Sequence, residues 1–529
     1  MTSMNDLIAT AEGLVVGVRG KRLRAGTISW KGIPYAAPPV GPLRFRAPQP
    51  APPLKGKFLA NRYGKAEIQD KLYTATGAGG FQPMSEDCLT LNVFSPDRIS
   101  ATPRPVMVFI HGGAYLLGAT ATPLYDGALL AKAGGVIVVT IQYRFGPFGC
   151  LDFSQFSSPG RKIDDNLCLR DQVAALEWVQ RNIASFGGDP DNVTVFGESA
   201  GGSAVTALLA TPAAEGLFHK AIAQSPANEL NLSKDTADHL AGEFVKMLAD
   251  RSYRAGSGGA PIEKSRALEL LHSASPEVLH KVGKKLTAYT PQSGLGEFLP
   301  FGPTFGTDYL PEEPNQAARH GNTHPVPLII GTNRDEANLF TKGMSLLPGN
   351  NRDSLEGVFP TGEEVFVSVP DPASRTELVE AYRVGHRGGD PVHMLGDSVF
   401  WGPAVPFIEG HAAAGNPTYV YRYDFDTKVL RATGMRATHA MELFPVFGMF
   451  RSFGAGLAAG DWRNTGKITR VMQGHWSTFA RTSQPELQWT RYTAEHRDTM
   501  VFDVHSRMVS DPYPERREAW MRAHGQVPA

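Results

Sequence analysis

The segment Phe196-Gly197-Glu198-Ser199-Ala200-Gly201-Gly202 has the residue types and spacing that can make a serine nucleophilic. It lies between an alternating run at 192–196, typical of a strand, and a small-residue stretch at 203–210, typical of a helix. In such a Gly-x-Ser-x-Gly turn the serine hydroxyl is held clear of the backbone, and glycines permit the close approach of strand and helix. Ser199 is therefore the candidate nucleophile. An ordinary capping serine stays the alternative unless the chain also supplies a base, an acid and an oxyanion hole.

A second segment, His111-Gly112-Gly113-Ala114-Tyr115, could supply that oxyanion hole. It follows the run at 105–110, which is apolar as a buried parallel strand would be. A glycine pair directly after a central strand exposes backbone N–H groups without side-chain cover, as an oxyanion hole requires. A simple glycine turn is the alternative, and the presence of Ser199 downstream favours the oxyanion hole.

A serine nucleophile also needs a base and a third group that orients the base. Of the 15 histidines, His439 follows a late strand at 419–423 and precedes an apolar stretch, the position of a base carried by a loop. His475 is the competitor, but it lies in a helical pattern and is expected to pack in the core. Asp335 and Glu336 follow the strand at 327–331, and the spacing does not say which of the two faces the base. The order serine, acid, histidine is that of α/β-hydrolases.

The elements that must position these residues alternate between strand and helix. Apolar runs at 105–110, 135–141, 192–196, 220–224, 327–331 and 419–423 predict buried strands, and 165–183 and 465–482 predict helices. This alternation predicts a large, mostly parallel central sheet flanked by helices, with the site at the carboxyl ends of the strands. Residues 11–30 predict an opening antiparallel hairpin. We expect one elaborated domain over 1–529, with helical excursions over the active edge at about 230–325 and 340–412.

Composition excludes several other classes of function. The 52 basic and 52 acidic residues balance without a long block of one sign, which gives no support to a nucleic-acid or anionic-membrane partner. No window approaches the roughly 18 apolar residues of a membrane span, and residues 1–20 do not resemble a signal peptide. Three cysteines cannot form a fully paired framework, which indicates a reducing compartment. We therefore expect a cytoplasmic protein that acts on a small neutral molecule without a cofactor or metal.

Taken together, these motifs resemble the type-B carboxylesterase family, which includes the cholinesterases, over roughly 13–495. The residues that carry the resemblance are the segments 32–36, 86–93, 111–114, 196–202 and 331–336, together with Asn166, Asp171-Gln172 and 175–179. The resemblance implies an α/β-hydrolase fold and the hydrolysis of carboxylic esters through an acyl-enzyme.

The resemblance also assigns roles to individual residues. It implies Ser199 as the nucleophile, Glu336 rather than Asp335 as the acid, and His439 as the base. It implies an oxyanion hole made by the backbone N–H groups of Gly112, Gly113 and Ala200. Glu198 and Ser225 match positions that polarise the histidine network, and Arg44 is expected to pair with Glu86 in a structural role.

Three departures from the family pattern limit what can be inferred about the substrate. Residues 64–84 contain no tryptophan, so a choline ester is not expected. Cys88 has no upstream cysteine and is expected to be a free, buried thiol, as in intracellular bacterial esterases. Pro226 stands where the family usually has glycine, so the resemblance does not define the local wall of the acyl pocket.

Several alternatives stay open at this point. An amide or carbamate hydrolase, an acyltransferase or a non-catalytic binding protein could use the same scaffold. The natural ester and the oligomeric state are not determined by the sequence. Six aromatic side chains could line a substrate pocket or belong to the core: Tyr115, Phe340, Phe400, Trp401, Phe444 and Phe447.

Overall fold

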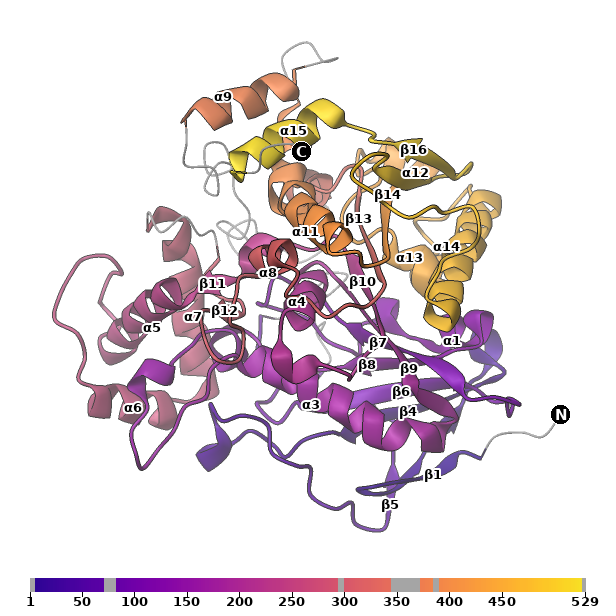
Figure 1. Ribbon diagram of the computed structural model, residues 1–529. Helices are drawn as coiled ribbons and strands as arrows, with labels where there is room; N and C mark the ends of the chain where they lie inside the picture. Colours follow the sequence, from indigo (N-terminus) through magenta and orange to yellow (C-terminus); the bar gives the residue numbers. More distant parts are fainter. Residues whose placement is uncertain (1–4, 71–81, 294–298, 344–371, 384–389, 526–529) are drawn as a thin grey trace.

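One large sheet runs through the molecule (Figure 1). Its strands at 188–198 and 104–110 end just before Ser199 and the glycine pair. The computed structural model describes residues 5–70, 82–293, 299–343, 372–383 and 390–525. In these residues the sheet has 11 strands, in the order β16 (Arg507–Ser510), β15 (Asp498–Phe502), β14 (Thr418–Tyr423), β13 (Leu328–Asn333), β10 (Lys220–Gln224), β9 (Gly188–Glu198), β7 (Arg104–Ile110), β8 (Ile137–Ile141), β6 (Thr90–Pro96), β4 (Thr27–Pro34) and β3 (Val18–Arg19).

The centre of the sheet is parallel and its edges are antiparallel. All neighbouring pairs from β15 to β8 are parallel, whereas β16 and the β6–β4–β3 edge pair antiparallel. Parallel strands covered on both faces are apolar throughout, and β7 is buried from its second residue to its last. The predicted fold class, a mostly parallel sheet flanked by helices, is therefore confirmed.

Helices cover both faces of the sheet and divide the core into two clusters. On β7, Val106, Val108 and Ile110 belong to one cluster, and Met107 and Phe109 to the other. The first cluster holds α3 (Leu167–Asn182) and α4 (Ala200–Leu209), and the second holds α1 (Ala128–Gly134), α13 (Leu443–Phe447) and α14 (Trp462–Thr482). Because successive side chains of a strand point to opposite faces, one strand contributes to both layers.

Two blocks of helices interrupt the strand order. The first, α5 (Lys234–Ala249), α6 (Lys264–Ser273), α7 (Pro276–Tyr289) and α8 (Pro314–His320), lies between β10 and β13 and includes a small parallel pair, β11 (Leu232–Ser233) and β12 (Thr304–Phe305). The second, α9 (Pro372–Ala381), α10 (Pro391–Gly396) and α11 (Gly402–Ala413), lies between β13 and β14. Residues 344–371 and 384–389 of the second predicted excursion lie outside the described residues. The chain continues to α12 (Lys428–Ala432) after β14 and ends with α15 (Pro514–Ala523).

The predicted antiparallel hairpin over 11–30 is confirmed only for its second part, where β3 and β4 pair antiparallel. The first hairpin starts earlier, as β1 (Leu7–Thr10) and β2 (Gly13–Val16), and joins β5 (Lys57–Leu59) in a separate sheet, while β3 and β4 belong to the main sheet. At Gly17, where the chain leaves one sheet for the other, a Cβ atom would lie 2.6 Å from the indole nitrogen of Trp30. That indole donates to the carbonyl of Asp6 at 2.9 Å. The alternation of apolar and polar residues continues across Gly17. The strand nevertheless ends there, where the chain packs against Trp30, and the chain continues as β3 in the main sheet.

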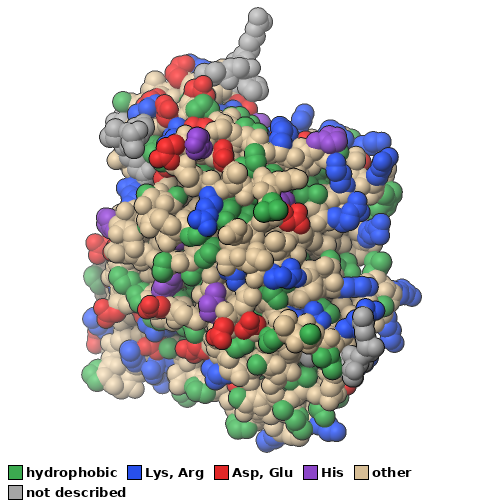
Figure 2. Space-filling view, turned by 45° about the vertical axis from the view of Figure 1, so that its right-hand side comes forward, with side chains coloured by type: hydrophobic (Ala, Val, Ile, Leu, Met, Phe, Trp, Pro, Cys, Tyr) green, Lys and Arg blue, Asp and Glu red, His purple; other side chains and the backbone are tan. Residues whose placement is uncertain are grey.

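The surface has no strong preference for one sign of charge on the face that Figure 2 shows. Acidic and basic side chains occur together over most of this face, with more basic side chains toward its right-hand edge. No helix of the described residues is long and apolar enough to cross a membrane.

Candidate active site

The turn after β9 holds Ser199 in a strained conformation that presents its side chain. Its backbone angles are φ 61° and ψ −127°, a region that L-residues rarely adopt, and α4 begins at the next residue. At Gly201 a Cβ atom would lie 2.1 Å from the carbonyl oxygen of Ile110, so only glycine fits where α4 passes β7. From 193 to 210 Ser199 is the one residue that is not fully buried. The local fold therefore leaves this hydroxyl as the accessible group.

Two neighbouring strand ends bring the acid and the base together. Glu336 follows β13, and His439 lies in the loop that follows β14 and α12. The Nδ1 atom of His439 is 2.6 Å from Oε2 of Glu336. The other oxygen of Glu336 accepts from the Ser225 hydroxyl and from the backbone N–H of Asn333, both at 2.6 Å. The carboxylate is thus fixed on both oxygens, and it fixes the imidazole.

Asp335 faces a different set of partners. Its carboxylate accepts from Nε of Arg334 at 2.9 Å and from the backbone N–H of Ala437 at 3.2 Å, and it lies 3.2 Å from Nε2 of His393. Burial alone would raise the pKa of Asp335, but His393 and Arg334 together lower it. Of the two carboxylates that the residue pattern left open, Glu336 contacts His439 and Asp335 pairs with an arginine.

The second ring nitrogen of His439 faces another carboxylate. Its Nε2 atom lies 3.0 Å from Oε1 of Glu198. This is an ion-pair distance, but the two groups are not aligned for a hydrogen bond. Burial opposes the charged imidazolium, but the carboxylates of Glu198 and Glu336 outweigh it and raise the pKa of His439 well above its ordinary value. Within the described part of the chain, the Ser199 hydroxyl makes no hydrogen bond.

A third buried carboxylate, Glu442, lies beneath the site and was not predicted. Its oxygens accept from Nε2 of Gln224 at 3.1 Å and from Nδ2 of Asn333 at 2.5 Å. Burial, followed by the negative charges of Glu198 and Glu336, raises its pKa to about 8. The charged form of Glu442 is therefore disfavoured, and a proton on Glu442 limits the negative charge around His439. The signal in the sequence was a glutamate one helical turn after His439, in a stretch that otherwise reads as apolar.

The glycine pair lies directly against the serine turn. A Cβ atom on Gly112 would lie 2.4 Å from the carbonyl oxygen of Glu198 and 2.8 Å from Cβ of Ser199. The backbone N–H groups of Gly112, Gly113 and Ala200 donate no hydrogen bond within the described residues. Three free N–H groups beside the hydroxyl match the requirement for holding a negatively charged oxygen.

A chain of hydrogen bonds orients the Gly112–Gly113 peptide. Ile110 and Ile141 are paired in the parallel register of β7 and β8, so the residues that follow them, His111 and Gln142, lie side by side. The backbone N–H of Thr120 donates to Oε1 of Gln142 at 3.1 Å, which identifies the amide oxygen. The amide nitrogen of Gln142 is then the donor to Nε2 of His111 at 3.2 Å. This leaves Nδ1 of His111 to donate to the carbonyl of Gly112 at 2.9 Å.

This chain fixes His111 as a neutral imidazole. Burial lowers the pKa of His111 to about 4, and a proton on Nε2 would face the amide N–H of Gln142. The carbonyl that His111 holds belongs to the same planar peptide as the N–H of Gly113. Holding one end of that peptide orients the other, so His111 and Gln142 position the predicted oxyanion donor.

Replacing Gln142 with leucine should therefore impair turnover more than substrate binding. We expect kcat for p-nitrophenyl butyrate to fall about 10- to 100-fold with KM changed by less than about threefold, because the donor acts on the transition state. Affinity for a trifluoromethyl ketone, which forms a tetrahedral adduct, should fall by a similar factor. The positioning role would be contradicted if the fall in kcat came with a lower melting temperature and the affinity for the ketone stayed at the parent's value.

Comparison with known proteins agrees with this geometry. The model of the carboxylesterase family matches residues 5–520. The chain belongs to the carboxylesterase family. Para-nitrobenzyl esterase of Bacillus subtilis (strain 168) is 37% identical over 527 residues, covering 99% of this chain and 100% of that protein. The medium-chain fatty acyl-CoA hydrolase precursor of Anas platyrhynchos is 32% identical over 525 residues, covering 94% and 88%. A solved thermophilic PNB esterase has a TM-score of 0.81 at 35% identity, covering 98% of this chain and 100% of that one.

Carboxylesterases are enzymes that cleave carboxylic esters, and the structural pairing expected from the family resemblance is present. Arg44 donates from Nε and Nη2 to the two oxygens of Glu86, both at 2.6 Å, and from Nη1 to the carbonyl of Ala274 at 2.8 Å. The pair is buried and ties the segment before β6 to the end of α6. Cys88, Cys150 and Cys168 are buried and free, as predicted for Cys88.

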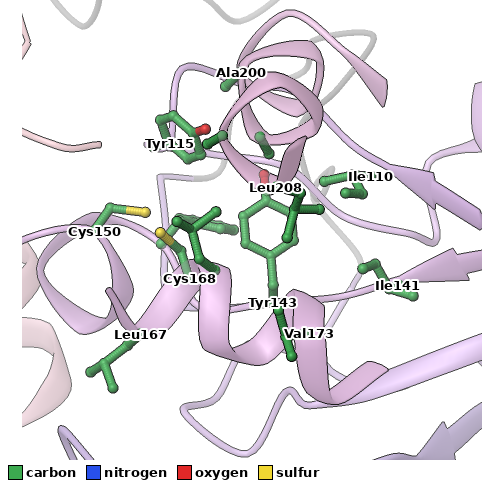
Figure 3. Close-up of a cluster of buried hydrophobic side chains, with 14 of the residues drawn as sticks. Ile110, Tyr115, Ile141, Tyr143, Cys150, Leu167, Cys168, Val173, Ala200 and Leu208 are labelled. Atoms are coloured by element: carbon green, nitrogen blue, oxygen red, sulfur yellow. The ribbon is translucent and has the colours of Figure 1, made fainter. Parts of the chain in front are cut away.

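The six candidate pocket aromatics divide into different environments in this carboxylesterase. The rings of Phe400 and Phe340 lie 4.3 and 5.3 Å from that of His439, so both flank the candidate base. Phe447 packs on Phe109 and Phe196 in the core, Phe444 stacks on Phe450, and Trp401 packs beside Trp520. Tyr115 is fully buried near Ala200, in the cluster with Cys150 and Cys168 that Figure 3 shows.

His475 behaves as predicted for a packing residue. It is buried in α14, with its ring 5.3 Å from Trp489 and 5.5 Å from Phe502. Burial lowers its pKa to about 4. No group of three or more His, Cys, Asp or Glu side chains in the described ranges is arranged to hold a metal ion.

Proposed function

We propose that this carboxylesterase cleaves esters in two steps through an acyl-enzyme, with Ser199 as the nucleophile, His439 as the base and Glu336 as the orienting acid. The observation that carries the proposal is the 2.6 Å contact between Nδ1 of His439 and Glu336, which leaves Nε2 on the side of the serine turn. Ser225 and Asn333 hold Glu336 in place for this contact.

In the first step the Ser199 oxygen bonds to the ester carbonyl carbon while its proton passes to Nε2 of His439. The carbonyl oxygen becomes negative and is held by the N–H groups of Gly112, Gly113 and Ala200. Collapse of this intermediate breaks the bond to the alcohol, which takes the proton from His439. Water then repeats the sequence, which releases the acid and restores the Ser199 hydroxyl.

For this chemistry His439 must start neutral and turn Nε2 from Glu198 toward the hydroxyl. A proton on Glu442 would remove part of the negative charge that favours the imidazolium, and the raised pKa of Glu442 supports this state. Catalytic hydrogen bonds commonly tighten only when substrate is bound. The Glu198 contact is thus consistent with a resting position of the base.

Covalent labelling tests the proposal directly. A 4-nitrophenyl alkylphosphonate should release one equivalent of nitrophenolate per chain and leave the phosphonyl group on the peptide that contains Ser199. Mass spectrometry of the digest locates the label. Labelling of a different serine, or no label while ester turnover persists, would overturn the assignment.

The substrate class is proposed from the relatives and from the aromatic side chains beside His439. The names of the para-nitrobenzyl esterases make a p-nitrobenzyl ester the first compound to assay, and Phe340 and Phe400 offer aromatic faces beside His439. Product analysis with a competing alcohol separates hydrolysis from acyl transfer. We also infer a reducing compartment such as the cytoplasm, which the three buried, free cysteines support.

A further inference from the structure

A polar cavity of about 310 Å³ lies away from the Ser199 turn, among the first helical block, α11 and the end of α15. Its wall includes Glu229 and Asn231 from the segment after β10, Glu313 before α8, and His524 after α15. The volume is at the lower end of the range of about 300–1,000 Å³ that small-molecule pockets occupy. The cavity therefore has room for a small organic molecule.

The floor of this cavity is a rigid network whose hydrogen bonds are satisfied. Thr206 donates to Oδ1 of Asn228 at 2.8 Å, and Nδ2 of Asn228 donates to Oδ1 of Asn315 at 3.0 Å. Glu313 accepts from the backbone N–H groups of Asn315 and Gln316 at 3.0 and 2.8 Å. Asn228 and Asn315 are both buried. A network fixed in this way positions the groups above it before any ligand arrives.

The groups that lack partners are hydrogen-bond acceptors. The carboxylate of Glu229 has no hydrogen bond or ion pair within the described residues, and its pKa is raised to about 7, first by burial and then by the negative charge of Glu313. Asn231 is 6% exposed, and its amide oxygen is buried with no hydrogen-bond partner. Its amide nitrogen already donates to the carbonyl of Asn228 at 2.8 Å. Glu229 and Asn231 thus both lack a donor.

The cavity wall carries more acidic than basic side chains. Arg319 lies on its wall, where it lowers the pKa of His524 and acts on Glu313. Burial and Arg319 lower the pKa of His524 to about 4, so His524 is neutral at pH 7. Two carboxylates therefore face one guanidinium. Glu229 is half-buried and has no counter-charge among the described side chains, so a cation beside it would favour its ionised form.

We propose that this cavity binds a small primary ammonium compound. An ammonium group carries three N–H donors and one positive charge, which complement Glu229, Asn231 and the remaining acceptor capacity of Glu313. The short apolar part of the ligand packs on Phe305 and Pro406, which lie on the same wall. A bare metal ion is the poorer fit, because no group of three or more acidic, His or Cys side chains in the described part of the chain could hold one.

Calorimetric titration with n-butylammonium chloride tests the proposal. The full-length protein should bind it with a Kd of about 1 mM at pH 8, as expected for a ligand of so few atoms. Tetramethylammonium, which has the charge without N–H donors, and n-butanol, which lacks the charge, should each bind at least about tenfold more weakly. A titration with calcium chloride tests whether the cavity binds a metal ion instead.

The variant Glu229→Gln keeps the shape of the side chain and removes its charge. It should weaken butylammonium binding at least about tenfold, whereas Glu215→Gln, the same change at an exposed position, should leave the Kd unchanged. Neither variant should lower the parent's ester turnover or melting temperature, which shows that both fold. In the parent, lowering the pH from 8 to 6 should weaken binding about tenfold as Glu229 takes up a proton, and Glu229→Gln should lose this dependence.

Three results would overturn the proposal. They are no binding of butylammonium by the parent, equal Kd values for the parent and Glu229→Gln, and binding of calcium without binding of butylammonium.

Discussion

Replacing Ser199 with alanine should lower kcat for p-nitrophenyl butyrate by about 10⁴- to 10⁶-fold, because no acyl-enzyme can form without the hydroxyl. The fold should survive, since Ser199 is only partly buried and its backbone, not its side chain, makes the contact to Gln224. Residual turnover should come from the oxyanion donors and binding alone. Steady-state kinetics with a melting curve on the same preparation measure both effects.

Ser203→Ala provides the matched control for Ser199→Ala. Ser203 lies one turn later in α4, is buried, and donates only to the carbonyl of Ser199 at 3.3 Å. Its loss should change kcat by less than about tenfold. If Ser199→Ala kept more than about a tenth of the parent's turnover, the nucleophile would have to be sought elsewhere.

The pair Glu336→Gln and Asp335→Asn should separate the two adjacent carboxylates. Glu336→Gln should lower kcat by about 10³- to 10⁴-fold, because a neutral amide can no longer hold the Nδ1–H tautomer or stabilise the imidazolium. KM should change little. The 2.6 Å contact with Nδ1 of His439 makes Glu336 the only one of the two that can act in this way.

Asp335→Asn should act on stability instead of catalysis. Asp335 is 5% exposed and pairs with Arg334 and His393, so its loss should lower the free energy of unfolding by about 3 kcal/mol while kcat falls less than about tenfold. Urea unfolding and steady-state kinetics of the two variants provide the comparison. Equal catalytic losses would mean that Asp335 and Glu336 share the role, in conflict with the proposed mechanism.

Local motifs were predictable because their physics is local. The turn at Ser199 and the glycine pair after β7 depend on backbone angles and on close approach of the backbone. The glycines at these positions indicate both features. The buried strands were predictable because apolar runs of strand length have one stable place in an α/β fold. The long helices at 165–183 and 465–482 followed from the equally local rule of apolar spacing.

Other features depended on partners far away in the chain. Gln142 and His111 meet because β7 and β8 are paired in register, and the local sequence of either segment does not predict this contact. Phe400 reaches His439 while Phe447 packs in the core, although both are aromatic residues near the end of a strand or helix. The division of the opening hairpin was likewise decided by Trp30.

By itself, the sequence determined the strand-turn-helix at Ser199, the glycine pair, the order of the proposed nucleophile, acid and base, and the parallel α/β class. The residue pattern left Asp335 and Glu336 open, and the family resemblance implied Glu336. The tertiary structure shows which partners each of the two side chains contacts, and it places Glu442 near His439. The physical reason is that adjacent residues at a strand end diverge, and their partners come from segments about a hundred residues away, so that only packing of the whole chain selects which carboxylate meets the base.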